Sequence, residues 1–259
     1  MPKDRDYDYD DDEERDCKSR GNSSLQGHLR RGVGEFLFVG LLTVFAVFAN
    51  TLYSVSGSPL PLLAVGFAFA AVLFAVQLIF GQYATGHGSL TNTLCLIFGD
   101  EGSRRGAAER RTNNITVGLV SIGSWIVWAY LMKWILPASF NQSLALTVPL
   151  PAYAGEFGLI VFLEGLGKTA LAHILLFSSS QYRGMWGAAG SSALLGLLVI
   201  ALGPVTGGSL NIGCSVGVHL AQDEWDSLEF AAYLVSTLLA ALVTVFVKLA
   251  LFRAKKEKK

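Results

Sequence analysis

Apolar residues are grouped along the chain into six long stretches that are separated by shorter, more polar connections. The stretches cover approximately residues 33–54, 62–80, 115–136, 157–177, 187–203 and 231–252. Each is close to the roughly 20 residues that a helix needs to cross the ~30 Å hydrocarbon layer of a membrane. Backbone polar groups find no water in that layer, so such stretches must be helical. The pattern therefore predicts an all-α membrane protein with six transmembrane helices.

The overall composition strengthens this prediction. The 259 residues are 52% hydrophobic and only 15% charged, and the mean hydropathy is +0.46, whereas soluble domains carry about 25% charged residues. The 20 basic and 20 acidic residues cancel, which argues against nucleic acid as a partner because phosphate binding requires a basic surplus. The three cysteines show neither a disulfide framework nor a metal-binding spacing with histidine. We therefore predict no metal and no cofactor.

The two ends of the chain differ from the apolar body. Residues 1–24 hold nine acidic and five basic side chains and almost no aliphatic ones, so burial cannot offset the entropy of ordering them. We predict a disordered acidic N-terminal tail over residues 1–30, a membrane domain over 31–252 and a basic C-terminal tail over 253–259.

Basic residues fall only in alternate connections between the apolar stretches. The connections around residues 55–61, 137–156 and 204–230 contain no Lys or Arg. Because basic residues are retained on the cytoplasmic side of a membrane, both termini are predicted to be cytoplasmic. The sequon that begins at Asn141 then lies on the outer side, where it is a candidate for glycosylation.

Two of the connections are not typical of plain loops. Residues 86–98 and 203–218 each begin with small residues, reach an asparagine and continue as an apolar run that is too short to span. This pattern predicts a re-entrant half-helix, in which extended chain enters the membrane and the Asn caps the helix. The two segments enter from opposite sides, so the halves of the chain, about 33–136 and 157–252, are predicted to be inverted three-helix repeats.

An acidic residue precedes each predicted half-helix at a comparable distance. These residues are Glu35 in the first span and Glu164 in the fourth. A carboxylate in lipid is costly, so each should face protein and accept hydrogen bonds from irregular backbone. Glu156 competes with Glu164 for this role, although its place before the apolar stretch favours an interfacial position. For Lys168 we favour an ion pair with Glu164, four residues earlier, over the lining of a water-filled cavity.

Together these features resemble the aquaporin (major intrinsic protein) family. The residues that carry the resemblance are Gly34-Glu35-Phe36, Glu164-Gly165-Leu166-Gly167 and the segment 203–211, followed by Ser215 and Gly217. The family carries Asn-Pro-Ala in each half, whereas this chain has Asn92-Thr93-Leu94 and Asn211-Ile212-Gly213. It is therefore similar to a divergent member with degenerate motifs. A second register places Thr91 at the first Asn position.

The resemblance implies a homotetramer in the bilayer, with a pore through each chain for water or small uncharged solutes. Two half-helix N-termini would meet at mid-membrane and repel cations, while Asn92 and Asn211 donate hydrogen bonds to the passing molecule. Val199 and Cys214 occupy the filter positions, and the family carries arginine at the second of these. The rest of the predicted pore lining is Thr93, Leu94, Ile212 and Gly213.

Two other functions are also compatible with the sequence. The missing prolines and the missing arginine fit a closed pore, in a structural or junction-type membrane protein. The segment 213–217 matches the G-x-S-x-G nucleophile motif, which would need His173 or His219 beside Ser215 in an intramembrane serine protease. Small residues that allow close helix packing are the simpler interpretation of this segment. We therefore predict a channel without catalytic residues.

Overall fold

The regular structure of the described chain is entirely helical. The computed structural model describes residues 26–45, 47–48, 60–80, 88–99, 107–135, 155–178, 185–222 and 226–253. Residues 26–30, which the sequence assigned to the disordered tail, are helical and belong to an N-terminal helix (residues 26–45 and 47–48). The acidic segment 1–24, the sequon at Asn141 and most of the basic tail lie outside the described residues.

Five helices within these ranges are long and apolar enough to cross a membrane. They are α2 (Leu60–Phe80), α4 (Ala107–Ile135), α6 (Phe157–His173), α8 (Met185–Thr206) and α10 (Ser227–Arg253). A short π-helix, η2 (Ile174–Ser178), continues α6. The N-terminal helix covers the described part of the first predicted span. Each of the six predicted apolar stretches therefore coincides with a helix.

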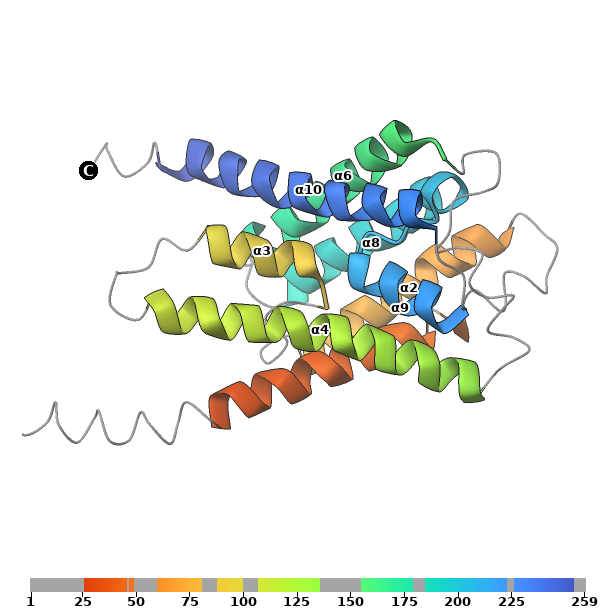
Figure 1. The fold of residues 1–259 in the computed structure, drawn as a ribbon, viewed down its shortest axis with the longest axis horizontal. Coiled ribbons are helices and arrows are strands. Elements are labelled where there is room, and N and C mark those ends of the chain that lie inside the picture. Colours follow the sequence, from red (N-terminus) through yellow and green to blue (C-terminus); the bar gives the residue numbers. More distant parts are fainter. Residues whose placement is uncertain are drawn as a thin grey trace, which may run out of the picture.

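Two further helices, α3 (Leu90–Phe98) and α9 (Ile212–Gln222), have only nine and eleven residues (Figure 1). At 1.5 Å per residue they are about 14 and 17 Å long, roughly half the thickness of the hydrocarbon layer. Both pack against α4 and α10. The structure therefore contains the two predicted half-helices, and each is packed against the third span, α4, and the sixth span, α10.

The second spans of the two halves, α2 and α8, cross at a pair of glycines. A Cβ atom at Gly196 would lie 2.6 Å from the carbonyl oxygen of Gly66, and one at Gly66 would overlap Ile200. No side chain fits between backbones this close, which is why small residues occupy membrane helix crossings. The crossing joins equivalent elements of the two repeats, as inverted repeats require.

Trp128 of α4 fixes the N-terminal helix in place. Its indole N–H donates to the carbonyl oxygen of Phe36 at 3.1 Å, and the two rings are 5.4 Å apart. Gly40 leaves room for the indole, because a Cβ there would overlap the ring. Near the first residue of this helix, His28 Nδ1 lies 2.7 Å from Asn113 Oδ1 of α4. These contacts orient the helix so that Glu35 is fully buried.

Candidate functional site

Glu35 holds the turn that leads into α3. Its Oε1 accepts a hydrogen bond from the backbone N–H of Gly88 at 2.6 Å. Gly88 has φ +67°, a left-handed conformation that glycine adopts without a Cβ penalty. The carbonyl oxygen of Gly88 accepts the indole N–H of Trp125 at 2.8 Å. Two side chains from other helices thus satisfy the buried backbone N–H and C=O groups of Gly88. Glu35 accepts a hydrogen bond from irregular backbone, as the sequence predicts.

Glu164 stabilises the turn that leads into α9 in the same way. Its Oε2 accepts the backbone N–H of Leu210 at 2.9 Å, and its Oε1 accepts the hydroxyl of Thr206 at 2.7 Å. Leu210 has φ +48°, so it is left-handed like Gly88 although it carries a side chain. Glu156, the competing acid, is the exposed N-cap of α6. Of the two competing acids, Glu164 is therefore the buried one.

This correspondence fixes the register of the first motif. Asn211 follows Leu210, and its Oδ1 accepts the N–H of Gly213 at 3.0 Å, as an N-cap side chain does. Its counterpart in the first half is Ser89, the N-cap of α3. The prediction that Asn92 caps the first half-helix is wrong, and so is the alternative register at Thr91, because both residues lie inside α3 and are 2% exposed. The pattern match favoured asparagine, whereas serine is also common at an N-cap. Ser89 has the extended backbone of an N-cap residue, but its side chain makes no capping hydrogen bond in the described structure.

The two half-helices meet through their entry turns. The side-chain Nδ2 of Asn211 donates to the carbonyl oxygen of Gly88, on the turn of the opposite half. The same oxygen accepts the indole N–H of Trp125. Because each helix N-terminus carries roughly half a positive charge, two positive helix ends converge at this point.

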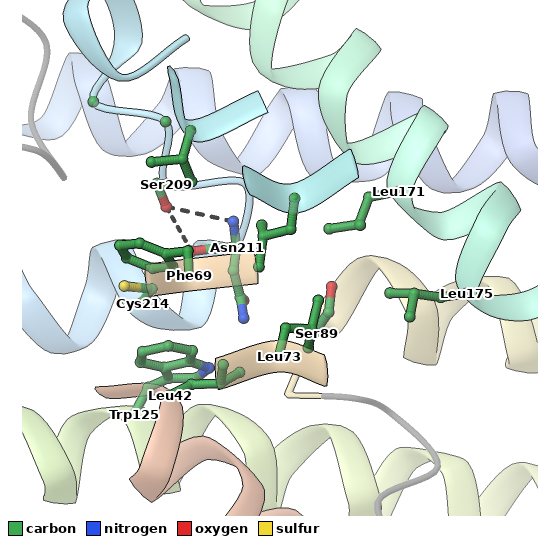
Figure 2. Close-up of a pocket in the computed structure, with 14 residues that line it drawn as sticks. Leu42, Phe69, Leu73, Ser89, Trp125, Leu171, Leu175, Ser209, Asn211 and Cys214 are labelled. Atoms are coloured by element: carbon green, nitrogen blue, oxygen red, sulfur yellow. Dashed lines mark hydrogen bonds between the residues drawn. The ribbon is translucent and has the colours of Figure 1, made fainter. Parts of the chain in front are cut away.

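A cavity of about 80 Å³ lies beside the meeting point (Figure 2). One water molecule needs about 10–15 Å³ of cavity volume, so the cavity is large enough for several water molecules. Its polar lining comes from the two entry turns, namely Ser89, residues 207–209 and Asn211. The remaining lining residues are Leu42, Phe69, Leu73, Trp125, Leu171, Leu175, Leu195, Val199 and Cys214. The cavity is therefore mostly apolar, with a few polar groups from the entry turns.

Three predicted pore residues line this cavity: Asn211, Val199 and Cys214. The others do not: Asn92, Thr93, Leu94, Ile212 and Gly213. Gly213, for example, faces the ring of Trp125, since a Cβ there would lie 2.7 Å from it.

The sequence pattern does not predict most of the apolar lining. Phe69 and Leu73 lie four residues apart on α2, and Leu171 and Leu175 lie four apart on α6 and η2. This i, i+4 spacing places each pair on one helix face. In spans that are apolar all around, however, the same spacing occurs on every face, so it does not single out the pore side.

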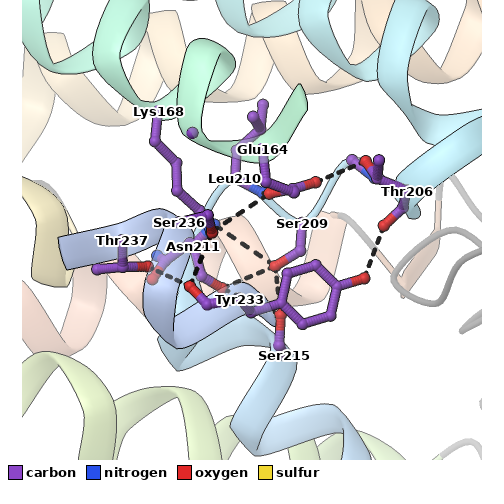
Figure 3. A network of polar contacts seen from close by, with 12 residues as sticks. Glu164, Lys168, Thr206, Ser209, Leu210, Asn211, Ser215, Tyr233, Ser236 and Thr237 are labelled. Carbon is purple, nitrogen blue, oxygen red and sulfur yellow. Dashed lines mark hydrogen bonds and ion pairs between the residues drawn. The ribbon is translucent and has the colours of Figure 1, made fainter. Parts of the chain in front are cut away.

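Lys168 is buried behind Glu164 and is only 1% exposed. Its Nζ lies 3.4 Å from Glu164 Oε2 and donates to Ser236 Oγ at 2.7 Å and to the Tyr233 carbonyl oxygen at 3.3 Å (Figure 3). The ion pair expected from the sequence is therefore present, and Lys168 does not line the cavity.

Ser215 belongs to a polar cluster around the α9 entry turn. Its Oγ lies 2.5 Å from Ser209 Oγ and 3.5 Å from the Asn211 carbonyl oxygen, and the residue is 1% exposed. His173 uses its Nδ1 on the Thr169 carbonyl oxygen at 2.9 Å. Ser215 thus hydrogen-bonds within the re-entrant turn, and the other candidate, His219, is buried four residues further along α9.

The arrangement of helices resembles that of a solved channel. The X-ray structure of the aquaglyceroporin from Plasmodium falciparum aligns with a TM-score of 0.64, over 85% of this chain and 95% of that one. The fold is aquaporin-like. The identity is 15%, so the likeness concerns the fold alone. No family model and no curated protein matches the sequence.

The comparison confirms the predicted fold class, an all-α membrane protein with an aquaporin-like fold, in which five of the described helices can span a membrane and two are half-helices. The protein is a multi-pass integral membrane protein. Within the aquaporin-like fold, this chain has Ser89 and Asn211 at the two half-helix caps and Cys214 three residues after the second cap. The described lining of the cavity therefore has one side-chain amide and no cationic side chain.

Proposed function

We propose that the protein is a passive channel for water and small uncharged solutes. The observation that carries this proposal is the meeting of two half-helix N-termini, through Asn211 and Gly88, beside a cavity large enough for water. The positive helix ends disfavour cations. The Asn211 amide retains one N–H for a passing molecule, because an amide has two and Gly88 accepts one.

The cavity lining supports weak discrimination between water and other neutral solutes. Val199 and Cys214 occupy the positions that the resemblance assigns to the filter, and both line the cavity. Neither side chain offers the strong donors of an arginine. A mostly apolar wall with a few polar groups suits a small uncharged solute that has both kinds of surface.

We further propose a homotetramer in the bilayer with both termini cytoplasmic, no cofactor and no nucleic-acid partner. Four arginines support the orientation: Arg30, Arg31, Arg110 and Arg111. The contact between His28 and Asn113 brings them to the same end of the molecule. Figure 1 shows the C-terminal end of α10 at that end as well. A cluster of basic residues on one side is typical of the cytoplasmic face.

A second candidate is a closed-pore structural membrane protein. The direct hydrogen bond between Asn211 and the Gly88 carbonyl favours it, because this bond crosses the point where the halves meet.

Stopped-flow swelling of proteoliposomes separates the two candidates. Vesicles that contain the protein should respond faster than empty vesicles to water, glycerol or urea gradients. Asn211→Ala should lower this flux, whereas Asn114→Ala, which changes a partly exposed asparagine of α4, should leave it unchanged. Flux equal to that of empty vesicles would contradict the channel and favour the closed-pore candidate.

A further inference from the structure

The third and sixth spans carry very different side chains at equivalent positions. Six residues after its N-cap, α9 has Gly217, whose Cβ would lie 2.7 Å from the carbonyl oxygen of Trp125 on α4. Six residues after its own N-cap, α3 has Cys95, whose Sγ lies 3.8 Å from the carbonyl oxygen of Ala241 on α10. Trp125 and Ala241 therefore occupy equivalent places in the inverted repeats. Only one of the two places holds a large side chain.

The indole ring of Trp125 forms part of the cavity wall (Figure 2). It is the largest of the side chains that line the cavity in the described structure. Ala241 is not among these lining residues. Because the cavity of about 80 Å³ has room for only several water molecules, a bicyclic ring in its wall has a strong influence on its width.

The ring of Trp125 is fixed in position by two neighbours. Its indole N–H donates to the carbonyl oxygen of Gly88 at 2.8 Å. On another side, a Cβ at Gly213 would lie only 2.7 Å from the ring atom Cδ1, so α9 leaves no room for the ring to tilt toward it. The leucine and phenylalanine side chains of the lining have no polar atom that could hold them in the same way. The indole is therefore the part of the wall that is least able to move aside for a larger solute.

The Trp125 ring presents a passing solute with bulk rather than with hydrogen bonds. Its N–H is already bonded to the Gly88 carbonyl oxygen, which also accepts the side-chain Nδ2 of Asn211. A carbonyl oxygen has two lone pairs, so both are in use. Neither the indole N–H nor this oxygen is left to bind a solute, and the ring acts on solutes through its shape.

We propose that Trp125 is a specificity-determining residue that sets the upper size of the neutral solutes that the channel conducts. Pore diameter is one of the means by which channels select solutes. It carries more weight in this lining, because the described residues include no cationic side chain that would select by strong hydrogen bonds. This inference rests on the proposed function, since it concerns the solutes that the same pore admits.

A graded series of linear polyols tests the proposal. The flux of glycerol, erythritol and xylitol into proteoliposomes is measured relative to the water flux of the same vesicles. Trp125→Leu removes the ring and should raise the relative flux of erythritol and xylitol about tenfold. Trp125→Phe keeps one ring but loses the N–H, and it should raise them less, about threefold. The matched control is Trp134→Leu, the same substitution at an 80% exposed position in the last turn of α4, which should keep the wild-type ratios.

Unchanged ratios in a folded Trp125→Leu protein overturn the proposal. A rise in Trp125→Phe as large as that in Trp125→Leu also overturns it, since the lost hydrogen bond to Gly88 would then explain the effect. Entry of sucrose, which should stay outside all vesicles, contradicts the proposal because it would reveal damaged packing. If Trp125→Leu does not fold, Trp125→Phe is the test by itself, and wild-type ratios in that variant contradict the proposal. A wild-type protein without water or glycerol flux contradicts the proposed function itself.

Discussion

The first and second repeats build the same entry turn from different residues. A carboxylate binds the N–H of a left-handed residue in each: Glu35 binds Gly88 in the first, and Glu164 binds Leu210 in the second. The caps that follow differ, with serine in the first half and asparagine in the second. Buried backbone must be satisfied whatever the cap is. The repeats thus share the carboxylate and the turn geometry, while the motif residues vary.

The halves also differ in where they place positive charge. In the second half, Lys168 lies beside the carboxylate. A second lysine of the same half, Lys248 of α10, donates to the carbonyl oxygen of Gly99 at 2.6 Å, at the C-terminal end of the first half-helix, α3. The C-terminal end of α9 has a neutral partner instead, since the Tyr130 hydroxyl donates to the Leu220 carbonyl at 2.9 Å. A cation at a helix C-terminus interacts favourably with the helix dipole.

The largest effect expected from this comparison is a difference between the two carboxylates. Glu164→Leu should cost about 3–5 kcal/mol, because it leaves the buried Lys168 without its counter-charge. Glu35→Leu should cost about 1–3 kcal/mol, since it removes the acceptor of the Gly88 N–H. Unfolding in detergent measures both losses, with the exposed Glu156→Gln as the control. Equal losses at the two sites would show that Lys168 adds nothing to the role of Glu164.

A smaller loss is expected where the halves cross. Gly196→Val should cost about 1–3 kcal/mol, because the new side chain meets the backbone of Gly66. Gly190→Val on the same helix is the control, since a Cβ at that position has no neighbour within 4 Å. Thermal unfolding of both variants checks the difference, and a loss that is the same at both positions would argue against the close crossing.

A still smaller effect is expected at the entry turn of the first half. Gly88→Ala should cost about 1–2 kcal/mol, because alanine pays for a left-handed φ that glycine adopts freely. Gly123→Ala should be neutral or stabilising by up to about 1 kcal/mol, since it lies within α4 with open space around its Cβ position. Denaturant unfolding of the two variants compares them. A Gly88→Ala protein as stable as the wild type would contradict the left-handed turn.

The smallest stability effect is expected from making the caps alike. Ser89→Asn gives the first half the cap of the second, and both residues are good N-caps, so the free energy of unfolding should change by less than about 0.5 kcal/mol. The same unfolding assay measures it. A loss above about 1 kcal/mol would show that the two caps are not equivalent.

Hydropathy predicts the spans because lipid demands long apolar helices, and the cost of burying charge points to Glu35 and Glu164. The sequence misplaces the N-cap of the first half-helix because several residues near position 90 are suitable N-caps. Only the left-handed turn at Gly88 shows that Ser89 occupies this position. The apolar cavity wall, such as Phe69, leaves no sequence signal, because pore-facing and lipid-facing leucines and phenylalanines have the same character.

Block of flux by a mercurial shows whether neutral solutes pass through the cavity beside the two half-helix N-termini. Cys214 lines this cavity, whereas Cys95 is buried between α3 and α10, with its Sγ 3.8 Å from the Ala241 carbonyl oxygen. We predict that a mercurial lowers wild-type flux to the level of empty vesicles, that Cys214→Ala abolishes the inhibition and that Cys95→Ala retains it. Unchanged inhibition of Cys214→Ala would place the conducting path elsewhere and contradict the account.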